Sequence, residues 1–171
     1  MTQLQQQSDV ASDVAAPTRV PVIRHAHEGR ATRAFGNEIL FKLGGHESGG
    51  ELTVGLAGAP AGGGPPLHVH HAEDELFLVL EGTYRVYVEG AWTEAGPGAL
   101  VYLPRGIPHT FQVTEDGPGK HWVITTPSGF DRYFAACEAV FAEPGPPDIA
   151  RISAINAEFH NEILGKPGTR P

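Results

Sequence analysis

The stretch GGGPPLHVHHAEDELFLVLEG, residues 62–82, decides the fold because its polar residues are spaced for two adjacent strands. His68 and His70 are two residues apart, and side chains two apart on a strand point to the same side. Glu75 follows a short turn, at the start of the next apolar run. We therefore expect a hairpin that brings two imidazoles and one carboxylate to one point inside a barrel.

A second stretch, GALVYLPRGIPH at residues 98–109, delivers one more histidine. Gly98, Pro104 and Gly106 predict tight turns, and His109 follows the last of them. Three imidazoles and one carboxylate suit a borderline divalent ion such as Fe, Mn, Ni, Co, Cu or Zn, without choosing among these metals. The predicted ligands of this ion are His68, His70, Glu75 and His109.

Short apolar runs separated by turns fill the chain from residue 20 to residue 127. The whole chain has 22 glycines and 15 prolines. With those glycines and prolines that lie between them, these runs predict many short strands in an antiparallel sandwich or barrel. A first strand is expected at residues 20–23 and a clearer one at residues 39–43. In residues 51–57, Leu52, Val54 and Leu56 alternate with smaller residues and are expected to face the core.

After Pro127 the apolar spacing becomes helical. Ser128 and Asp131 resemble a capping box that opens a first helix, and Asp148 is expected to open a second one that Gly165 and Pro167 close. The apolar stripes of these helices are expected to pack on the barrel or on a second subunit. The first stripe is Phe130, Phe134, Cys137 and Phe141, and the second is Ile149, Ile152, Phe159 and Ile163. The expected layout is a disordered leader at residues 1–19, a barrel at 20–127 and a helical extension at 128–171.

The charge balance excludes some classes of partner. Twenty acidic and twelve basic residues give a net charge of -8, which repels nucleic acids and anionic membranes. The N-terminal residues lack a basic start followed by an apolar run, so neither a signal peptide nor a membrane anchor is expected. The single cysteine, Cys137, excludes an internal disulfide and is expected to be a buried thiol. We expect a cytoplasmic protein with a small-molecule partner.

The two quoted stretches resemble the two motifs of the cupin superfamily. The first motif, G-x5-HxH-x4-E-x6-G, is met without a gap at Gly62, His68, His70, Glu75 and Gly82. The second, G-x5-PxG-x2-H-x3-N, is met at Gly98, Pro104, Gly106 and His109, with Val113 in place of the final Asn. The resemblance covers roughly residues 39–127. It implies an all-β fold, the cupin double-stranded β-helix or jelly-roll barrel, to which C-terminal α-helices are added.

Within the superfamily, residues 65–82 and the appended helices look most like the single-domain quercetin 2,3-dioxygenase-like group. In that group the three histidines and the glutamate bind one metal, and the glutamate deprotonates the flavonol. The resemblance therefore implies that Glu75 is both ligand and general base. It implies a dioxygenase that uses O2 to oxidise a flavonol-like or other bidentate enol or hydroxy-ketone. A metal-dependent isomerase, lyase or hydrolase that does not use O2, and a non-catalytic small-molecule-binding cupin, are the alternatives.

Large apolar residues in the expected strands predict the wall of a substrate pocket, although the same residues would also serve as an ordinary barrel core. They are Phe41, Leu52, Val54, Phe77, Val79, Tyr102, Phe111 and Trp122. His71 is expected to point away from the metal. Ordinary core or surface positions are expected for His25, His27, His46, His121 and His160. Cupins commonly pair through edge strands, and the helix stripes offer a further surface, so we expect a homodimer.

Overall fold

The chain folds as a series of antiparallel strands followed by two helices and a last short strand. The computed structural model describes residues 19–165, so the expected leader lies, except for Arg19, outside the described residues. The elements in chain order are β1 (Arg30–Ala34), β2 (Asn37–Leu43), α1 (Gly45–Ser48), β3 (Thr53–Ala59), β4 (His68–His70), β5 (Asp74–Glu81), β6 (Tyr84–Val88), β7 (Ala91–Ala95), β8 (Leu100–Leu103), β9 (His109–Val113), β10 (Gly119–Thr126), α2 (Phe130–Phe141), α3 (Ile149–Glu158) and β11 (Asn161–Ile163). The prediction of an all-β fold with C-terminal α-helices is confirmed.

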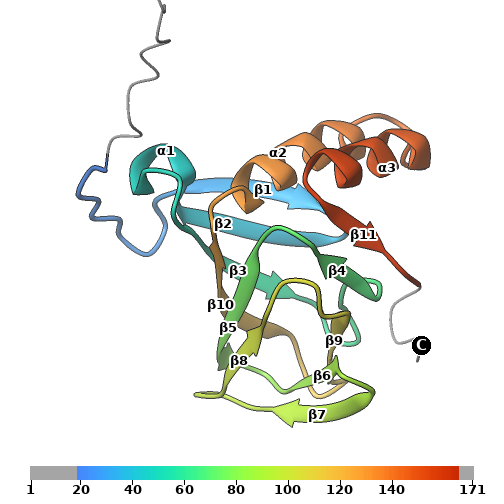
Figure 1. Ribbon diagram of the computed structural model, residues 1–171. Helices are drawn as coiled ribbons and strands as arrows, with labels where there is room; N and C mark the ends of the chain where they lie inside the picture. The colour runs from blue at the N-terminus through green and yellow to red at the C-terminus, as the bar shows by residue number, and fades with distance from the viewer. Residues whose placement is uncertain (1–18, 166–171) are drawn as a thin grey trace, which may run out of the picture.

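The strands form two antiparallel sheets that enclose the core (Figure 1). One sheet has the order β1-β2-β3-β10-β5-β8, and the other has the order β11-β4-β9-β6-β7. Strands that are distant in the sequence, such as β3, β10 and β5, are direct neighbours, as the jelly-roll expectation requires. The helices α2 and α3 lie together at one end of the barrel, beside β1 and β11 (Figure 1).

Strand β3 presents its small residues to the barrel interior, which is the opposite of the expected phase. Gly55 and Ala57 are buried, whereas Leu52 is exposed and Val54 is half-buried. A Cβ atom on Gly55 would lie 2.6 Å from Cγ2 of Ile39, so the inward face has no room there for a larger side chain. The predicted alternation of period two is correct, but the large side chains of this strand are on the outer face of the sheet.

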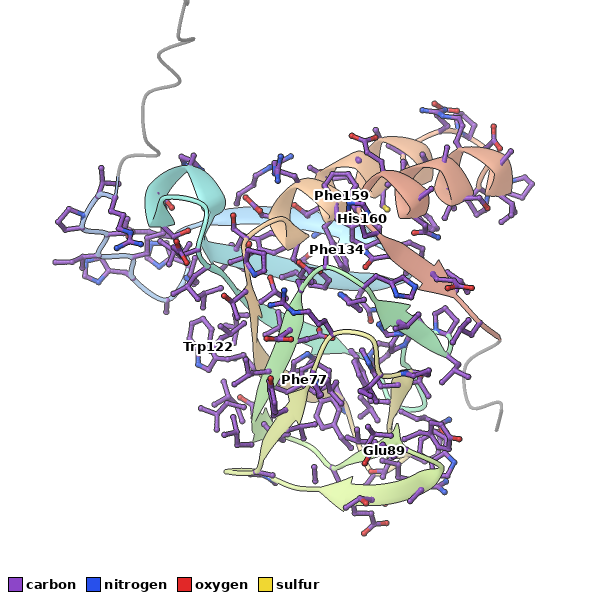
Figure 2. All side chains as sticks on the ribbon, in the orientation of Figure 1. Phe77, Glu89, Trp122, Phe134, Phe159 and His160 are labelled. Carbon is purple, nitrogen blue, oxygen red and sulfur yellow. The ribbon has the colours of Figure 1, made fainter. Side chains whose placement is uncertain are left out.

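Strand β10 lies between β3 and β5 and follows the same division. His121 and Val123 are buried inside the barrel, and Trp122 between them is directed outward. Figure 2 shows Trp122 projecting away from the barrel while Phe77 of β5 points into it. The six-stranded sheet is therefore apolar on both of its faces, which is why the sequence pattern did not reveal which face is inside.

Helix α2 buries its apolar stripe against the β1-β2 hairpin of the same chain. Phe35, at the turn of this hairpin, has its ring centroid 4.8 Å from that of Phe141 and 6.2 Å from that of Phe134. The N-cap is Gly129, and no side chain caps the helix, so the expected capping box at Ser128 is not formed. This stripe packs on the barrel, which was one of the two expected alternatives.

Helix α3 is shorter than the sequence pattern predicted. Asp148 caps it through hydrogen bonds from the backbone N–H groups of residues 150 and 151, as expected, but the helix ends at Glu158. His160 has a φ of 56°, which turns the chain out of the helix. Residues 161–163 then form β11, which pairs antiparallel with β4 so that Asn161 lies opposite His70.

Two further outcomes complete the comparison of the described residues with the expected elements. Residues 20–23 form no strand, and the only pairing near them is an isolated bridge between Arg19 and Ser48. In residues 19–165, no helix combines the length and the apolar character needed to cross a membrane.

Candidate metal centre

The four predicted ligands meet at one point inside the barrel. His68 and His70 come from β4, Glu75 from the start of β5, and His109 from the start of β9. One ligand atom of each residue lies within 4.8 Å of those of the other three. Oε2 of Glu75 is 3.3 Å from Nε2 of His109 and 3.8 Å from Nε2 of His70. His68 is half-buried, and the other three side chains are almost completely buried.

Each of the three histidines has its Nδ1 atom bonded to an acceptor outside this cluster. The acceptors are the carbonyl of Pro66 for His68, the carboxylate of Glu73 for His70 and the carbonyl of Ile107 for His109, each at 2.8 Å. An acceptor at Nδ1 holds the proton on that nitrogen and leaves a lone pair on Nε2. Metal-binding histidines use this arrangement, because it fixes both the tautomer and the ring orientation.

A divalent transition ion fits this donor set. Bonds of about 2.0–2.2 Å place the ligand atoms of a single ion roughly 3–4.4 Å apart, close to the spacing of the four donors. Three imidazole nitrogens and one carboxylate oxygen suit the borderline metals from iron to zinc. The cluster could therefore hold one such ion with little movement of its side chains.

The pKa values of the cluster residues favour the binding of a cation. Burial, together with repulsion from charge on His109 and His70, lowers the pKa of His68 to about 3. Burial by itself would raise the pKa of Glu75, but the hydrogen bond with His109 and the charges of the three histidines lower this pKa to about 2. For His70, burial lowers the pKa, whereas the hydrogen bond with Glu73 and the charge of Glu75 raise it, and the net shift is upward. Glu75 is thus an ionised carboxylate at neutral pH.

Glu73 belongs to the candidate site, and the sequence analysis missed it. The residue is 7% exposed, and its Oε1 atom is the acceptor that fixes Nδ1 of His70. The turn between β4 and β5 folds this carboxylate back beneath the histidine three residues earlier. The spacing of three residues from His70 was a usable signal. However, Glu73, Asp74 and Glu75 follow one another from the end of this turn into β5, and nothing local distinguishes them.

The loop that carries His109 is held on both sides. The Asp74 carboxylate accepts hydrogen bonds from the backbone N–H of Arg105 at 2.9 Å and from its Nε at 3.0 Å. The backbone N–H of Gly106 donates to the carbonyl of His70 at 2.8 Å. Gly106 has a φ of 81°, a conformation that other residues rarely adopt, which explains why the motif requires glycine there. These contacts place His109 opposite strand β4.

A cavity lies beside the cluster and extends beneath α2. Its volume is about 90 Å³, against roughly 10–15 Å³ for one water molecule measured in the same way. The wall is mostly apolar, and none of the described residues that line it is Lys or Arg. It includes His68, His70, Glu75, Ala57, Ala59, Pro65, Pro66, Phe77, Phe111, Val123, Phe130, Tyr133 and Phe134. The cavity can therefore take a mostly apolar molecule of several heavy atoms.

Of the residues predicted for the pocket wall, Phe77 and Phe111 line this cavity. Phe41 and Val79 are buried in the barrel but do not line the cavity. The remaining members lie on the outer face, because the strands that carry them have the opposite phase to the predicted one. These outward residues are Leu52, Val54, Tyr102 and Trp122. Phe130 and Phe134 of α2, which were expected in a helix stripe, line the cavity together with Tyr133.

His121 lines the cavity as well, deeper in the barrel, and its chemistry differs from that of the cluster. It is 4% exposed, and its Nδ1 atom is 2.9 Å from the hydroxyl of Tyr84, which is fully buried. The Tyr84 hydroxyl has no other acceptor among the described residues, so it donates to Nδ1 and the proton of the imidazole stays on Nε2. Burial lowers the pKa of His121 to about 4, so the ring is neutral at pH 7. The expectation of a core position is correct, but this histidine also borders the cavity.

Asn161 reaches the cavity wall from β11. It is 7% exposed, and its side-chain oxygen has no hydrogen-bond partner among the described residues. A buried polar atom without a partner costs about 1–3 kcal/mol, so a ligand that supplied a donor would be favoured there. No local sequence signal indicated this residue, because only the pairing of β11 with β4 brings it to the site.

Comparison with protein families identifies the barrel. Residues 55–125 match the model of the Cupin domain family. These residues form a cupin domain. The matched stretch contains all four cluster residues, whereas the cavity residues supplied by α2 and β11 lie outside it.

Solved structures with a similar fold support this assignment of the cupin domain. KdgF from a Halomonas species is 19% identical, with a TM-score of 0.55, and the match covers 67% of this chain and 99% of that one. An RmlC-like cupin from Shewanella frigidimarina is 16% identical, with a TM-score of 0.57 and coverages of 67% and 97%. The polyketide cyclase RemF from Streptomyces resistomycificus is 22% identical, with a TM-score of 0.55 and coverages of 64% and 81%. At these identities the similarity establishes the fold.

One curated relative matches part of the chain. It is an uncharacterized protein of Streptomyces coelicolor, 33% identical over 66 residues, which are 38% of this chain and 62% of that protein. The matched stretch therefore spans less than two thirds of the length of that relative.

Proposed function

We propose that this cupin is a metal-dependent dioxygenase for an apolar small molecule with two neighbouring oxygens, such as a flavonol, an enediol or a hydroxy-ketone. The observation that carries the proposal is the hydrogen bonding of the three histidines. Because each Nδ1 atom is bonded to an acceptor outside the cluster, three Nε2 lone pairs remain beside the Glu75 carboxylate.

A divalent ion bound to His68, His70, Glu75 and His109 would supply a Lewis acid that holds and polarises the two substrate oxygens. The chain's own residues would carry out the other tasks. The ionised Glu75 accepts the proton of the substrate hydroxyl. Phe77 and Phe111 pack on the flat body of the substrate and keep water away from it.

The proposed oxidation is balanced without an outside reductant. In an enediol or its hydroxy-ketone tautomer, the bond between the two oxygen-bearing carbons breaks, each carbon gains one oxygen atom of O2, and two carboxylic acids form. In a flavonol, both ring bonds of the hydroxyl-bearing carbon break, this carbon leaves as carbon monoxide, and both oxygen atoms of O2 enter the remaining product. Glu75 returns its proton to an oxygen of the product.

The chemistry of the cavity favours this substrate class over a sugar phosphate. A bound phosphate is usually held by Arg or Lys side chains, and none of the described lining residues is of either kind. Apart from the cluster, the polar lining side chains are the neutral groups of Asn37, His121, Tyr133 and Asn161. The substrate would therefore carry its reactive oxygens at the cluster and few polar groups elsewhere.

A reaction without O2 is the second candidate. The same four ligands would serve an isomerase, lyase or hydrolase, since a Lewis acid and a carboxylate base suffice for proton transfer. RemF, which has a similar fold, is named as a polyketide cyclase, so the fold is compatible with chemistry other than oxygenation. An experiment with and without O2 separates the two candidates.

The test begins with elemental analysis of protein purified without chelators. Protein loaded in turn with Fe, Mn, Ni, Co, Cu and Zn is then screened for O2 consumption with flavonols, diketones and catechols. His70→Gln is expected to lose both the metal and the activity. His71→Gln is the matched control, because this neighbouring histidine is 51% exposed in its side chain and pairs with Glu162 instead.

Each outcome of this screen distinguishes a candidate. O2 consumption with one substrate class, lost in His70→Gln, supports the dioxygenase. Conversion of a substrate at the same rate under anaerobic conditions supports the second candidate. Binding without any turnover, with every metal, would leave a small-molecule-binding cupin.

A further inference from the structure

The cavity extends from the metal cluster to a second polar group, His121, that the proposed mechanism does not use. The inward-facing residues of β5 run from Glu75 through Phe77 to Val79, and Phe77 points into the barrel (Figure 2). Val79 is the direct cross-strand partner of His121 on β10. Four residues of a strand span about 13 Å, so His121 lies well away from Glu75, at what we call the inner end of the cavity.

Tyr84 holds the His121 ring in one orientation. The hydroxyl of Tyr84 is 2.9 Å from Nδ1 of His121 and donates to it, and Tyr84 is fully buried. Gly119 leaves room for the tyrosine ring, since a Cβ atom there would lie 2.8 Å from Cε2 of Tyr84. The two nitrogens of an imidazole lie on different sides of the ring. Nε2 of His121 therefore faces away from Tyr84 and carries the proton.

The Nε2–H group of His121 has no acceptor among residues 19–165, in which the ring hydrogen-bonds with Tyr84 alone. Its nearest aromatic neighbours along the cavity are Phe77 and Phe111, with ring centroids at 5.0 Å and 5.5 Å. His121 is only 4% exposed, and leaving a buried donor without a partner is costly. Because His121 lines the cavity, a ligand that brings an acceptor would remove this cost.

We propose that His121 is a specificity-determining residue, whose Nε2–H group binds a hydrogen-bond acceptor at the end of the substrate remote from its two neighbouring oxygens. This inference rests on the proposed function, because it places those oxygens at the metal cluster. Tyr84 does not line the cavity. It is a positioning residue that acts through His121.

The acceptor that fits the inner end is a neutral one, such as a carbonyl, an ether or a ring nitrogen. His121 is uncharged at neutral pH, because burial lowers its pKa to about 4. None of the described lining residues is Lys or Arg, so a charged acceptor would lie there without a fixed cation.

Aromatic side chains shape the space between the cluster and the inner end. Phe77 and Phe111 both line the cavity, and they meet edge to face with their ring centroids 5.3 Å apart. Such a wall favours a flat ligand. A molecule of two linked rings, with neighbouring oxygens on one ring and an acceptor at the far tip of the other, has the shape that the two ends require.

The test compares two probes of the same shape, 4-phenylcatechol and 4-(4-pyridyl)catechol. Both carry neighbouring oxygens, and they differ only in the outermost position, where a C–H group is replaced by a nitrogen acceptor. Calorimetry measures their affinities for the Zn²⁺-loaded full chain at pH 8, because zinc has no redox chemistry that could start turnover. The pyridyl probe is expected to bind about 10-fold more tightly, which is the typical value of one such hydrogen bond.

Three variants assign this preference to its residues. His121→Phe keeps a flat ring without the donor and is expected to bind both probes equally, and its binding of 4-phenylcatechol shows that it is folded. Tyr84→Phe is expected to keep only part of the preference, because nothing then holds the proton of His121 on Nε2. Tyr87→Phe is the matched control on the same strand, since the ring of Tyr87 packs on Trp92 instead. It is expected to keep the full preference.

A measurement on the wild type does not depend on the folding of any variant. Long-range ¹H–¹⁵N NMR spectra distinguish the protonated nitrogen of a histidine from the unprotonated one. In His121, Nε2 is expected to be protonated and Nδ1 unprotonated. The Nε2 proton is expected to shift downfield when the pyridyl probe binds, and to shift much less with the phenyl probe. In Tyr84→Phe the same spectra should show a mixture of the two tautomers.

Four results would overturn the inference. Equal affinity of the wild type for the two probes, or a proton on Nδ1 of His121, would refute it and leave the proposed function standing. A preference that persists in His121→Phe would place the pyridyl nitrogen on the metal. If neither probe bound, the cluster would not hold the substrate oxygens, and this inference would fail together with the proposed function.

Discussion

Buried histidines border the cavity in two places, and their hydrogen-bond partners leave Nε2 unprotonated in one place and protonated in the other. In the cluster, acceptors hold the proton on Nδ1 of each ring and leave Nε2 with a lone pair beside Glu75. Deeper in the barrel, Tyr84 donates to Nδ1 of His121, and Nε2 keeps its proton. Burial is nearly the same for His70 and His121. The hydrogen-bond partner at Nδ1 therefore decides whether Nε2 of a buried histidine can bind a metal or can donate a hydrogen bond.

The largest expected effect follows from removing a charged ligand. Glu75→Gln should lower the affinity for a divalent ion by more than about 100-fold, because a direct ligand contributes more than the groups that orient it. His121→Gln should leave this affinity unchanged. Titration of the chelator-treated protein with Zn²⁺ or Ni²⁺ in a calorimeter measures both. If His121→Gln also lost the metal, the division between the two groups of histidines would be wrong.

A pH series tests the environment of His121. Its pKa is lowered from 6.5 to about 4 by burial, so between these values the unfolded chain binds a proton that the folded chain does not. Stability should thus rise with pH across this window, and about 3 kcal/mol at most is lost as the pH falls from 6.5 to 4. In His121→Gln, denaturant unfolding of the metal-free protein should show a shallower dependence. His46→Gln, at a side chain that is 78% exposed, should keep the wild-type slope.

Because Glu73 orients His70, removing its carboxylate should cause a moderate loss of metal affinity. Glu73→Ala removes the acceptor that fixes His70, and such orienting groups are typically worth about 10–100-fold in affinity. Glu162→Gln is the control, since Glu162 pairs with His71 at 3.0 Å on the surface. An equal loss in both variants, in the same calorimetric titration, would show that the net charge and not the orientation of His70 is responsible.

The smallest expected effect concerns the unpaired amide of Asn161. Asn161→Leu should change the free energy of unfolding by less than about 1 kcal/mol, because the oxygen has no partner to lose. Asn156→Leu should cost about 1–3 kcal/mol, since it leaves the buried hydroxyl of Tyr133 without its acceptor at 2.9 Å. Urea unfolding measures both changes. A similar loss in the two variants would mean that Asn161 supports the fold and is not free for a ligand.

The metal cluster was predictable from the sequence because its geometry is local. His68 and His70 share a strand face, and the tight turns before Glu75 and His109 follow from nearby residues. The phase of β3 was not predictable in this way. Sequence patterns assume that one face of a strand is polar, whereas Leu56 and Trp122 belong to an apolar outer face. The predicted pocket wall therefore includes residues such as Trp122 that lie on the outer face of the sheet.

Contacts between distant segments also escaped the sequence analysis. Asn161 reaches the cavity because β11 pairs with β4, and the α2 aromatics reach it because the helix folds back over the β1-β2 hairpin. Neither event leaves a local pattern. The expected helix through Ile163 was wrong for a related reason, since strand pairing overrides the helical spacing of three isoleucines and a phenylalanine.

The last strand has a practical consequence for work on the protein. Strand β4 shares one register pair with β9, but all three of its residues pair with β11, and the backbone N–H of Leu164 also donates to the carbonyl of Leu67. A purification tag, a protease cut or a shortened clone that disturbs residues 161–164 would therefore loosen His68 and His70. A fragment trimmed to residues 55–125 would carry every metal ligand and still be a poor substitute for the full chain.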